Sequence, residues 1–222
     1  MRIALIGYGK MGKAIEEIAL QKGHIISLKI DQQNANDLTT ENLQKADVAI
    51  EFTSPETAAD NIVKCFEASV PVICGTTGWL QKLEAVQKIC KEKAGTFLYA
   101  SNFSIGVNIF FQLNKNLADL MNGQDYDVIV TETHHTQKKD APSGTAITIA
   151  EQILQALAEK KKWVNKESHD KEELSIISKR IDPAPGKHQI RYSSAVDDIE
   201  IIHTAHNRKG FAAGALLAAE FI

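Results

Sequence analysis

The chain has 222 residues, of which 44% are hydrophobic and 24% charged, and its formal net charge is −3. This composition is typical of a globular protein with one large domain or two small ones, and the weak negative charge gives no reason to expect nucleic-acid binding. No apolar stretch is long enough to span a bilayer, and the three cysteines lack the spacing of a disulfide framework or a zinc site. We therefore expect a cytoplasmic protein with free thiols.

The first half of the chain alternates short apolar runs with segments of helical periodicity. Strands are expected at residues 3–6, 25–30, 47–52, 70–74 and 96–99, and helices at about residues 11–19, 55–68 and 80–93. This alternation predicts a parallel sheet with helices on both faces, which is an α/β fold.

The pattern changes near Asn102. Helices are expected at residues 105–121, 143–160 and 211–221, and strands at 127–132, 174–180, 188–194 and 199–204. The stretch 163–171 is polar, and we expect it to be exposed. Grouped strands predict a second, open sheet that is mixed or mostly antiparallel.

The segment Gly7–Gly12 fits the pattern G-x-G-x-x-G after one expected strand and before one expected helix. Gly7 allows the tight turn, Gly9 leaves room for a pyrophosphate, and Gly12 allows close packing of helix and strand. Asp31 lies 19 positions beyond Gly12, at the end of the second expected strand, where a carboxylate accepts hydrogen bonds from the adenosine ribose. The sequence thus predicts a dinucleotide site.

The residues around Asp31 bear on the choice of cofactor. The carboxylate repels a 2′-phosphate and Gln32 is not basic, which favours NADH over NADPH, although Lys29 or a loop residue could compensate. The segments Gly75–Thr77 and Ala100–Phe103 follow the fourth and fifth expected strands. Because ligands of open α/β sheets gather there, these segments either contact the nicotinamide half or are ordinary turns.

The loop from Glu132 to Thr145 carries two imidazoles, two ammonium groups and two carboxylates, and it ends at an expected helix N-terminus. Backbone N–H groups at a helix start bind anions, so the loop predicts acid–base chemistry on a small molecule that bears a carboxylate. Ser143 could instead cap the helix, and Asp140 could stabilise the loop by a hydrogen bond. No cysteine accompanies His134 and His135, and His203 and His206 would point to opposite faces of a strand, so we expect no metal.

Together these segments resemble the family of 4-hydroxy-tetrahydrodipicolinate reductase, also called dihydrodipicolinate reductase, of the diaminopimelate route to lysine. The resemblance lies in residues 7–12, 75–77, 100–103, 106–108 and 132–145, and more weakly in 199–203 and 211–215. It covers nearly the whole chain in the same order, and the stretch 132–145 is its most specific part.

The resemblance implies a Rossmann dinucleotide-binding domain, residues 1–102 and 207–222, closed by the C-terminal helix. It implies a second domain, residues 103–206, with an α+β substrate and tetramerisation fold built on an open mixed sheet. The protein would be a homotetramer that uses NADH or NADPH, without a metal, to reduce the cyclic imine formed from a dicarboxylate substrate by loss of water.

The resemblance also implies roles for single residues. His134 would be the proton donor and acceptor, and Lys138, rather than the adjacent Lys139, the proton donor to the intermediate. Substrate contacts would come from His135, Ser143, Gly144 and Thr145. Cofactor contacts would come from Gly7, Tyr8, Gly9, Lys10, Met11, Gly12, Asp31, Gly75, Thr76, Thr77, Ala100, Ser101, Asn102 and Phe103. These roles suit the chemistry, since hydride addition to a conjugated imine builds negative charge that an ammonium can neutralise and protonate.

Two alternatives stay open from the sequence. One is a related NAD(P)-dependent dehydrogenase that acts on an amino acid or another imino acid. The other is a regulator that binds NAD(H) without chemistry, although such a protein would not need the acid–base loop around His134 and Lys138.

Overall fold

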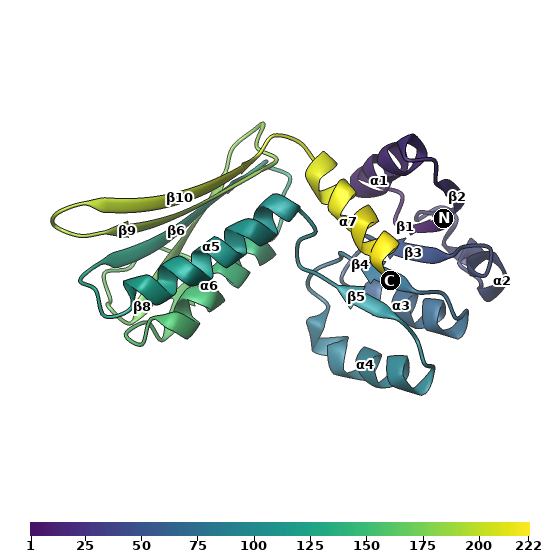
Figure 1. Ribbon diagram of the computed structural model, residues 1–222, viewed down its shortest axis with the longest axis horizontal. Helices are drawn as coiled ribbons and strands as arrows, with labels where there is room; N and C mark the ends of the chain where they lie inside the picture. Colours follow the sequence, from purple (N-terminus) through teal and green to yellow (C-terminus); the bar gives the residue numbers. More distant parts are fainter. The chain divides into compact units, whose positions relative to one another are not determined.

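The computed structural model describes all residues, 1–222, and the chain divides into two compact units. Unit 1 comprises Met1–Ile105 and Arg208–Ile222, and unit 2 comprises Gly106–Asn207. Each unit has its own five-stranded sheet (Figure 1). No helix of the chain is long and apolar enough to cross a membrane.

The sheet of unit 1 is parallel throughout, with strand order β2-β1-β3-β4-β5. Its strands are β1 (Arg2–Ile6), β2 (Ile25–Ile30), β3 (Val48–Glu51), β4 (Val72–Cys74) and β5 (Phe97–Tyr99). Three of them are buried almost along their whole length, which explains why they appear in the sequence as continuous apolar runs. The predicted parallel sheet is thereby confirmed.

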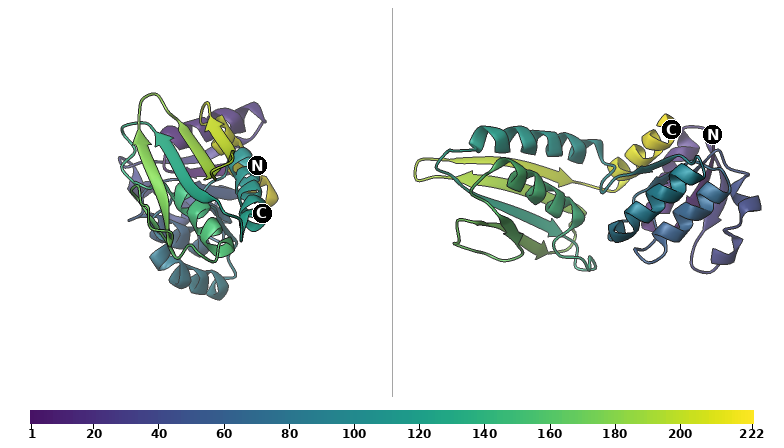
Figure 2. Two further views of the ribbon diagram at one scale, coloured as in Figure 1. Left: turned by 90° about the vertical axis from the view of Figure 1, so that its left-hand side faces the viewer. Right: turned by 90° about the horizontal axis from the view of Figure 1, so that it is seen from below.

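Helices cover both faces of this sheet (Figures 1 and 2). One face carries α1 (Lys10–Gln21) and α7 (Lys209–Phe221), and the other carries α3 (Ala58–Glu67) and α4 (Leu83–Glu92). The predicted C-terminal helix therefore packs on unit 1. Its small residues permit close contact, because a Cβ on Gly214 would lie 1.7 Å from the carbonyl oxygen of Phe103.

Two short elements of unit 1 were not predicted, and two helices begin later than predicted. The short elements are the 3₁₀ turn η1 (Ala35–Asp37) and the single helical turn α2 (Thr40–Leu43), which Thr39 caps by accepting the N–H of Asn42. The helix expected from about residue 80 begins as the 3₁₀ turn η2 (Leu80–Lys82) and continues as α4 from Leu83. The helix expected from residue 55 begins at Ala58, because the carbonyl of Ser54 accepts the N–H groups of Thr57 and Ala58 in a preceding turn.

The sheet of unit 2 is mixed, with strand order β10-β9-β6-β8-β7. Its strands are β6 (Asp127–His134), β7 (Lys162–Val164), β8 (Glu173–Arg180), β9 (Gly186–Ser193) and β10 (Asp198–Ala205). The β6–β8 and β7–β8 pairs are parallel, whereas β6–β9 and β9–β10 are antiparallel. The prediction of an open mixed sheet is confirmed.

Two predictions in unit 2 were wrong. Residues 162–164, expected mostly in an exposed polar stretch, form the edge strand β7, in which Trp163 pairs with Leu174. The helix expected to reach residue 160 ends at Ala156. The backbone leaves helical geometry at Leu157, and beyond it the buried side chain of Lys160 donates to the carbonyl oxygen of Glu173 on β8 at 3.2 Å.

The helices α5 (Ile105–Met121) and α6 (Gly144–Ala156) lie side by side on the sheet of unit 2 (Figure 1). Buried Asn114 of α5 joins them by donating to the carbonyl oxygen of Ile149 at 3.1 Å and to Gln152 Oε1 at 3.0 Å. The strand register places Glu132, His188 and His203 opposite one another on β6, β9 and β10. These three polar side chains thus form a row on the helix-covered face of the sheet. The row begins on β6, the strand that leads into the acid–base loop.

Candidate active site

The glycine-rich turn of unit 1 has the geometry that its sequence predicts. Gly7 has φ +99°, and a Cβ there would lie 1.9 Å from the carbonyl oxygen of Phe52. A Cβ on Gly12 would lie 2.4 Å from the carbonyl oxygen of Gly7, so helix and turn pack without space for a side chain. A Cβ on Gly9 would meet nothing within 4 Å, so the space beside Gly9 is open to a ligand.

A pocket of about 650 Å³ lies beside this turn. Of the predicted cofactor residues, Gly7, Tyr8, Gly9 and Asp31 line it, and the others do not. The remaining lining side chains were missed by sequence reasoning, and most of them follow β3: Phe52, Thr53, Ser54, Thr57, Asp60, Asn61 and Lys64. Their only signal in the sequence is that they follow a strand of the parallel sheet. The volume and the open glycine are compatible with an adenosine nucleotide.

Asp31 shapes the loop after β2. Its Oδ1 accepts the N–H groups of Gln33 at 2.8 Å and Asn34 at 3.3 Å, while Asn34 Oδ1 accepts the N–H of Asp31 at 2.7 Å. The carboxylate is thus fixed at the pocket wall, where it suits hydrogen bonds to a ribose hydroxyl.

The two other predicted cofactor segments have structural contacts inside unit 1. A Cβ on Gly75 would collide with the ring of Phe52 at 2.1 Å, so Gly75 makes room for a side chain that lines the pocket. Thr76 Oγ1 accepts the N–H of Thr53 at 2.8 Å. Phe103 packs against Phe52 with ring centroids 6.0 Å apart, and Asn102 Oδ1 accepts the N–H of Ser104 at 2.8 Å. Direct cofactor contact by these segments stays a prediction.

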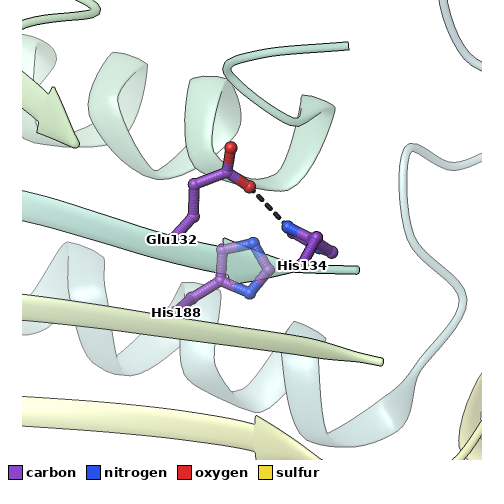
Figure 3. A group of neighbouring side chains, drawn as sticks. All are labelled: Glu132, His134 and His188. Atoms are coloured by element: carbon purple, nitrogen blue, oxygen red, sulfur yellow. Dashed lines mark ion pairs between the residues drawn. The ribbon is translucent and has the colours of Figure 1, made fainter. Parts of the chain in front are cut away.

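In unit 2, β6 ends in a buried carboxylate–imidazole pair. Glu132 is fully buried and His134 is 8% exposed. Both side chains point to the helix-covered face, since they lie two positions apart on one strand. His134 Nδ1 lies 2.6 Å from Glu132 Oε2 (Figure 3). The ring of His188, from β9, stands edge-on to the ring of His134, with the ring centroids 5.2 Å apart. Because Nδ1 faces the carboxylate, this arrangement favours the tautomer that carries its proton on Nδ1.

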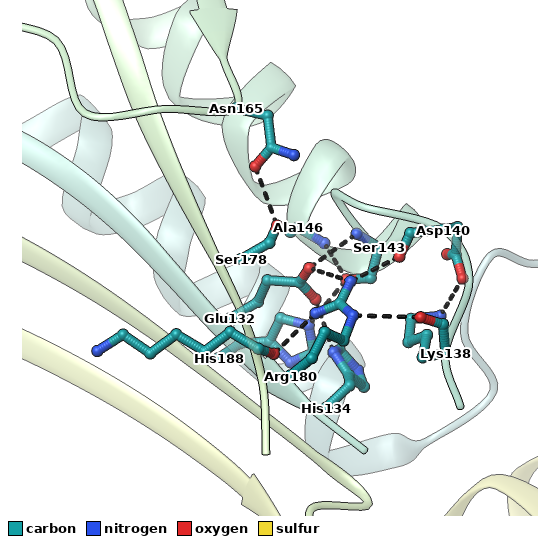
Figure 4. A network of polar contacts seen from close by, with 11 residues as sticks. Glu132, His134, Lys138, Asp140, Ser143, Ala146, Asn165, Ser178, Arg180 and His188 are labelled. Carbon is teal, nitrogen blue, oxygen red and sulfur yellow. Dashed lines mark hydrogen bonds and ion pairs between the residues drawn. The ribbon is translucent and has the colours of Figure 1, made fainter. Parts of the chain in front are cut away.

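Arg180, at the end of β8, joins this pair to the loop (Figure 4). Its Nη2 donates to Glu132 Oε1 at 3.0 Å and to the carbonyl oxygen of Asp140 at 2.6 Å, and its Nε donates to the carbonyl oxygen of Lys138 at 3.3 Å. The backbone N–H of Ser143 also donates to Glu132 Oε1, at 3.2 Å. One carboxylate therefore fixes the histidine, the arginine and the start of α6.

These contacts set the charges of the cluster. Burial alone would raise the pKa of Glu132, but the contacts with His134, Ser143 and Arg180 outweigh it and keep the pKa below its ordinary value. Burial, followed by the proximity of His134, lowers the pKa of His188 to about 3. Glu132 is therefore charged and His188 neutral near pH 7.

The loop residues have different roles in the structure. Lys138 Nζ lies 2.8 Å from Asp140 Oδ1, and the Lys138 side chain is 23% exposed, so the ammonium is accessible at the loop surface. Ser143 caps α6 by accepting the N–H of Ala146 at 3.2 Å, which confirms the capping alternative. Gly144 and Thr145 form the first helical turn, whose N–H groups suit an anion. Substrate contacts of His135, Ser143, Gly144 and Thr145 stay predictions.

Sequence reasoning named neither Arg180 nor His188 as a site residue. His188 lies 4% exposed in β9, where its Nε2 is 3.3 Å from Ser143 Oγ. Glu132, His134 and His188 bring possible metal-ligand atoms within 4.8 Å of one another. However, Glu132 is already paired with the Arg180 guanidinium, a positive charge that opposes a cation in this cluster. We therefore assign the three side chains to a hydrogen-bonded network.

A Rossmann-like unit with a glycine-rich turn and pocket, next in the chain to a unit with an acid–base cluster, is the organisation of a nicotinamide-dependent oxidoreductase. Models of the dihydrodipicolinate reductase N-terminus and C-terminus match residues 1–103 and 106–222. The chain belongs to the dihydrodipicolinate reductase family, which uses a nicotinamide cofactor.

Relatives agree with this membership. The chain is 49% identical over its full length to 4-hydroxy-tetrahydrodipicolinate reductase of Christiangramia forsetii, covering 92% of that protein. It is 35% identical to the reductase of the same name from Neisseria meningitidis, over 93% of this chain and 78% of that protein. The fold matches a dipicolinate-bound dihydrodipicolinate reductase from Paenisporosarcina sp. TG-14 with a TM-score of 0.73 and 24% identity, over 99% of this chain and 93% of that chain.

Proposed function

We propose that this protein reduces 4-hydroxy-tetrahydrodipicolinate to tetrahydrodipicolinate, with loss of water, in lysine biosynthesis by the diaminopimelate pathway. The observation that carries the proposal is the Glu132–His134–Arg180 network, which fixes the loop of Lys138 at the N-terminus of α6, in a chain 49% identical to a reductase of that name. A sensor of NAD(H) would need no such network.

The two units divide the chemistry. When bound, the nicotinamide supplies a hydride to the conjugated imine. The Lys138 ammonium neutralises the negative charge that develops and donates a proton to the intermediate. His134 exchanges protons through Nε2, because Nδ1 faces Glu132. Glycine at residue 186 leaves room at this atom, since a Cβ there would lie 3.2 Å from Nε2.

The proposed substrate is a dicarboxylate, and the start of α6 supports a site for one of its carboxylates. Gly144 and Thr145 begin α6, where backbone N–H groups and the helix dipole favour an anion. We assign the carboxylate to this helix turn, with His135 and Ser143 as neighbouring contacts. Asp140 accepts from Lys138 and stabilises the loop before substrate arrives.

For the cofactor, we assign NADH as the preferred dinucleotide. Asp31 repels a 2′-phosphate, and Gly9 leaves open space for a pyrophosphate. The other assigned contacts are Gly7, Tyr8, Lys10, Met11, Gly12, Gly75, Thr76, Thr77, Ala100, Ser101, Asn102 and Phe103. No metal takes part in the proposed reaction.

We assign residues 1–102 and 207–222 to cofactor binding and residues 103–206 to substrate binding and assembly as a homotetramer. The helices α5 and α6 lie on one face of the second sheet, and the opposite face carries no helix (Figures 1 and 2). Ile202 on that face is 48% exposed, as expected for a sheet that pairs with another copy. Sedimentation at several protein concentrations tests the tetramer.

The decisive experiment is a coupled assay in which substrate is made from pyruvate and aspartate semialdehyde by the preceding synthase. NADH and NADPH consumption are followed separately. Lys138→Ala should lower kcat by about 10²–10⁴-fold, the usual contribution of a positioned proton donor, while NADH binding stays nearly intact. Lys139→Ala removes the same charge one residue away and should retain turnover. Equal turnover of Lys138→Ala and wild type would contradict the assignment.

A further inference from the structure

A lysine close to the cofactor pocket is tied to a neighbouring carboxylate. Lys29 Nζ, on β2, lies 2.5 Å from Glu16 Oε1, on α1. The hydroxyl of Tyr8 donates to the other oxygen of Glu16, and the ammonium lies 5.0 Å from the centroid of the Tyr8 ring. Glu16 is thereby bound by two partners and its side chain is only 16% exposed, so it is a fixed anchor for the lysine.

This anchored lysine lies next to the residues that would face the adenosine ribose, although it does not itself line the pocket. Tyr8 and Asp31 both line the pocket, and Lys29 lies two positions before Asp31 and against the Tyr8 ring. Asn34 Nδ2 donates to the backbone carbonyl of Lys29 at 2.9 Å, which links the end of β2 to the loop that follows Asp31. The flexible stem of a lysine is long enough to bring its ammonium past the Tyr8 ring if the anchor is removed.

We propose that Glu16 is a cofactor-selectivity residue, which withholds the Lys29 ammonium from the ribose end of the pocket and thereby disfavours a dinucleotide with a 2′-phosphate. This inference rests on the proposed use of the pocket for NADH. A 2′-phosphate needs a cation near Asp31. The nearest cation along β2 is Lys29, and Glu16 neutralises its charge. Lys64 also lines the pocket, and so do the carboxylates of Asp31 and Asp60.

The pair is electrostatically stable at neutral pH. Hydrogen bonding to Glu16 raises the pKa of Lys29, and hydrogen bonding from Lys29 and then Tyr8 lowers the pKa of Glu16. Both groups stay charged, so the lysine is not released by ordinary changes of pH. Only a change in sequence or a stronger anion would release it.

The variant Glu16→Gln isolates the charge. Glutamine keeps an oxygen that accepts the Tyr8 hydroxyl, so the pocket wall is retained while the anchor for Lys29 loses its charge. A lysine–phosphate ion pair of about 1 kcal/mol corresponds to about fivefold in affinity, so the ratio of Kd for NADP⁺ to Kd for NAD⁺ should fall by about fivefold. The gain should shrink at high salt, since it is electrostatic.

Isothermal titration calorimetry of the full-length protein with NAD⁺ and NADP⁺, without substrate, measures this ratio. Glu17→Gln is the matched control, because Glu17 is the next residue of α1 and pairs with exposed Lys209 at 2.9 Å. It should leave the ratio at the wild-type value. In the double variant Glu16→Gln/Lys29→Ala the gain should disappear.

Two results would overturn the inference alone. They are an unchanged ratio in Glu16→Gln, and a gain that persists in the double variant, which would show that Glu16 acts only by its own repulsion. Failure of the wild type to bind either dinucleotide would overturn the proposed function and this inference together. Binding of both dinucleotides with no turnover would contradict the proposed reaction but leave the selectivity result intact.

Discussion

Replacing Glu132 by glutamine removes the charge on which the acid–base cluster of unit 2 is built. The carboxylate is fully buried, accepts from Arg180 at 3.0 Å and from the N–H of Ser143 at 3.2 Å, and faces His134 Nδ1 at 2.6 Å. Breaking a buried ion pair costs about 3–5 kcal/mol. The Arg180 side chain is 20% exposed and glutamine still accepts one bond, so we expect a loss of about 2 kcal/mol at pH 7.

The pH dependence of this loss identifies its cause. Because the pKa of Glu132 in the folded protein lies below its ordinary value of 4.5, the unfolded state takes up the proton first as the pH falls. The stabilisation is therefore fully present well above pH 4.5 and declines as the pH falls toward the folded pKa. The stability difference between wild type and Glu132→Gln should be largest at neutral pH and should narrow as the pH falls below about 4.5.

Urea unfolding followed by circular dichroism at neutral and acid pH measures the difference, and hydrogen exchange of the β6 amides assigns it to unit 2. Asp47→Asn is the comparison variant, because the pKa of Asp47 is also lowered, by hydrogen bonds from Arg2, yet the Arg2–Asp47 pair lies at the surface. It should cost much less stability. A difference for Glu132→Gln that stays constant with pH would refute the reasoning, because shape rather than charge would then account for it.

Two further predictions concern the glycine turn and the buried histidine. Gly9→Ala should weaken NADH binding by at least about tenfold while leaving the melting temperature unchanged. Gly7→Ala should instead destabilise unit 1 by more than about 1 kcal/mol, since its Cβ would lie 1.9 Å from the carbonyl oxygen of Phe52. Calorimetric binding and thermal melts measure both effects, and equal behaviour of the two variants would contradict the structural distinction between the two glycines. The pKa of His188 is lowered to about 3, so the unfolded chain binds its proton first and stability falls as the pH drops from 6.5 toward 3. His188→Gln should weaken this acid dependence in thermal melts at several pH values, and an unchanged dependence would count against a buried neutral His188.

Much of unit 1 could be predicted from its sequence because its signals are local. Buried parallel strands are continuous apolar runs. Gly7 and Gly12 mark positions where the backbone leaves no room for a side chain, and Gly9 marks a position where the space beside the backbone is open. The short elements are different. The strand β7 has three residues and exists because Trp163 pairs with Leu174 of β8, which no pattern within residues 162–164 can indicate.

The candidate site shows the same division. The loop residues His134 and Lys138 are visible because their chemistry is concentrated in one short stretch. The residues that organise them are distant in sequence, and only strand register brings them together. Register pairs His134 with Arg180 in the parallel β6–β8 ladder and Glu132 with His188 in the antiparallel β6–β9 ladder. A shift of one residue in either ladder would turn one partner to the opposite face.

The contacts of Arg180 also decide which group is available to bind a substrate carboxylate. Its guanidinium has five N–H donors, and it donates to Glu132 and to the carbonyl oxygens of Lys138, Lys179 and Asp140. An arginine so engaged has little capacity left for a bidentate contact with a ligand, although arginine is the usual residue for that task. We therefore propose that a substrate carboxylate binds to the backbone N–H groups that begin α6, and that Arg180 contributes by fixing the loop that leads to them.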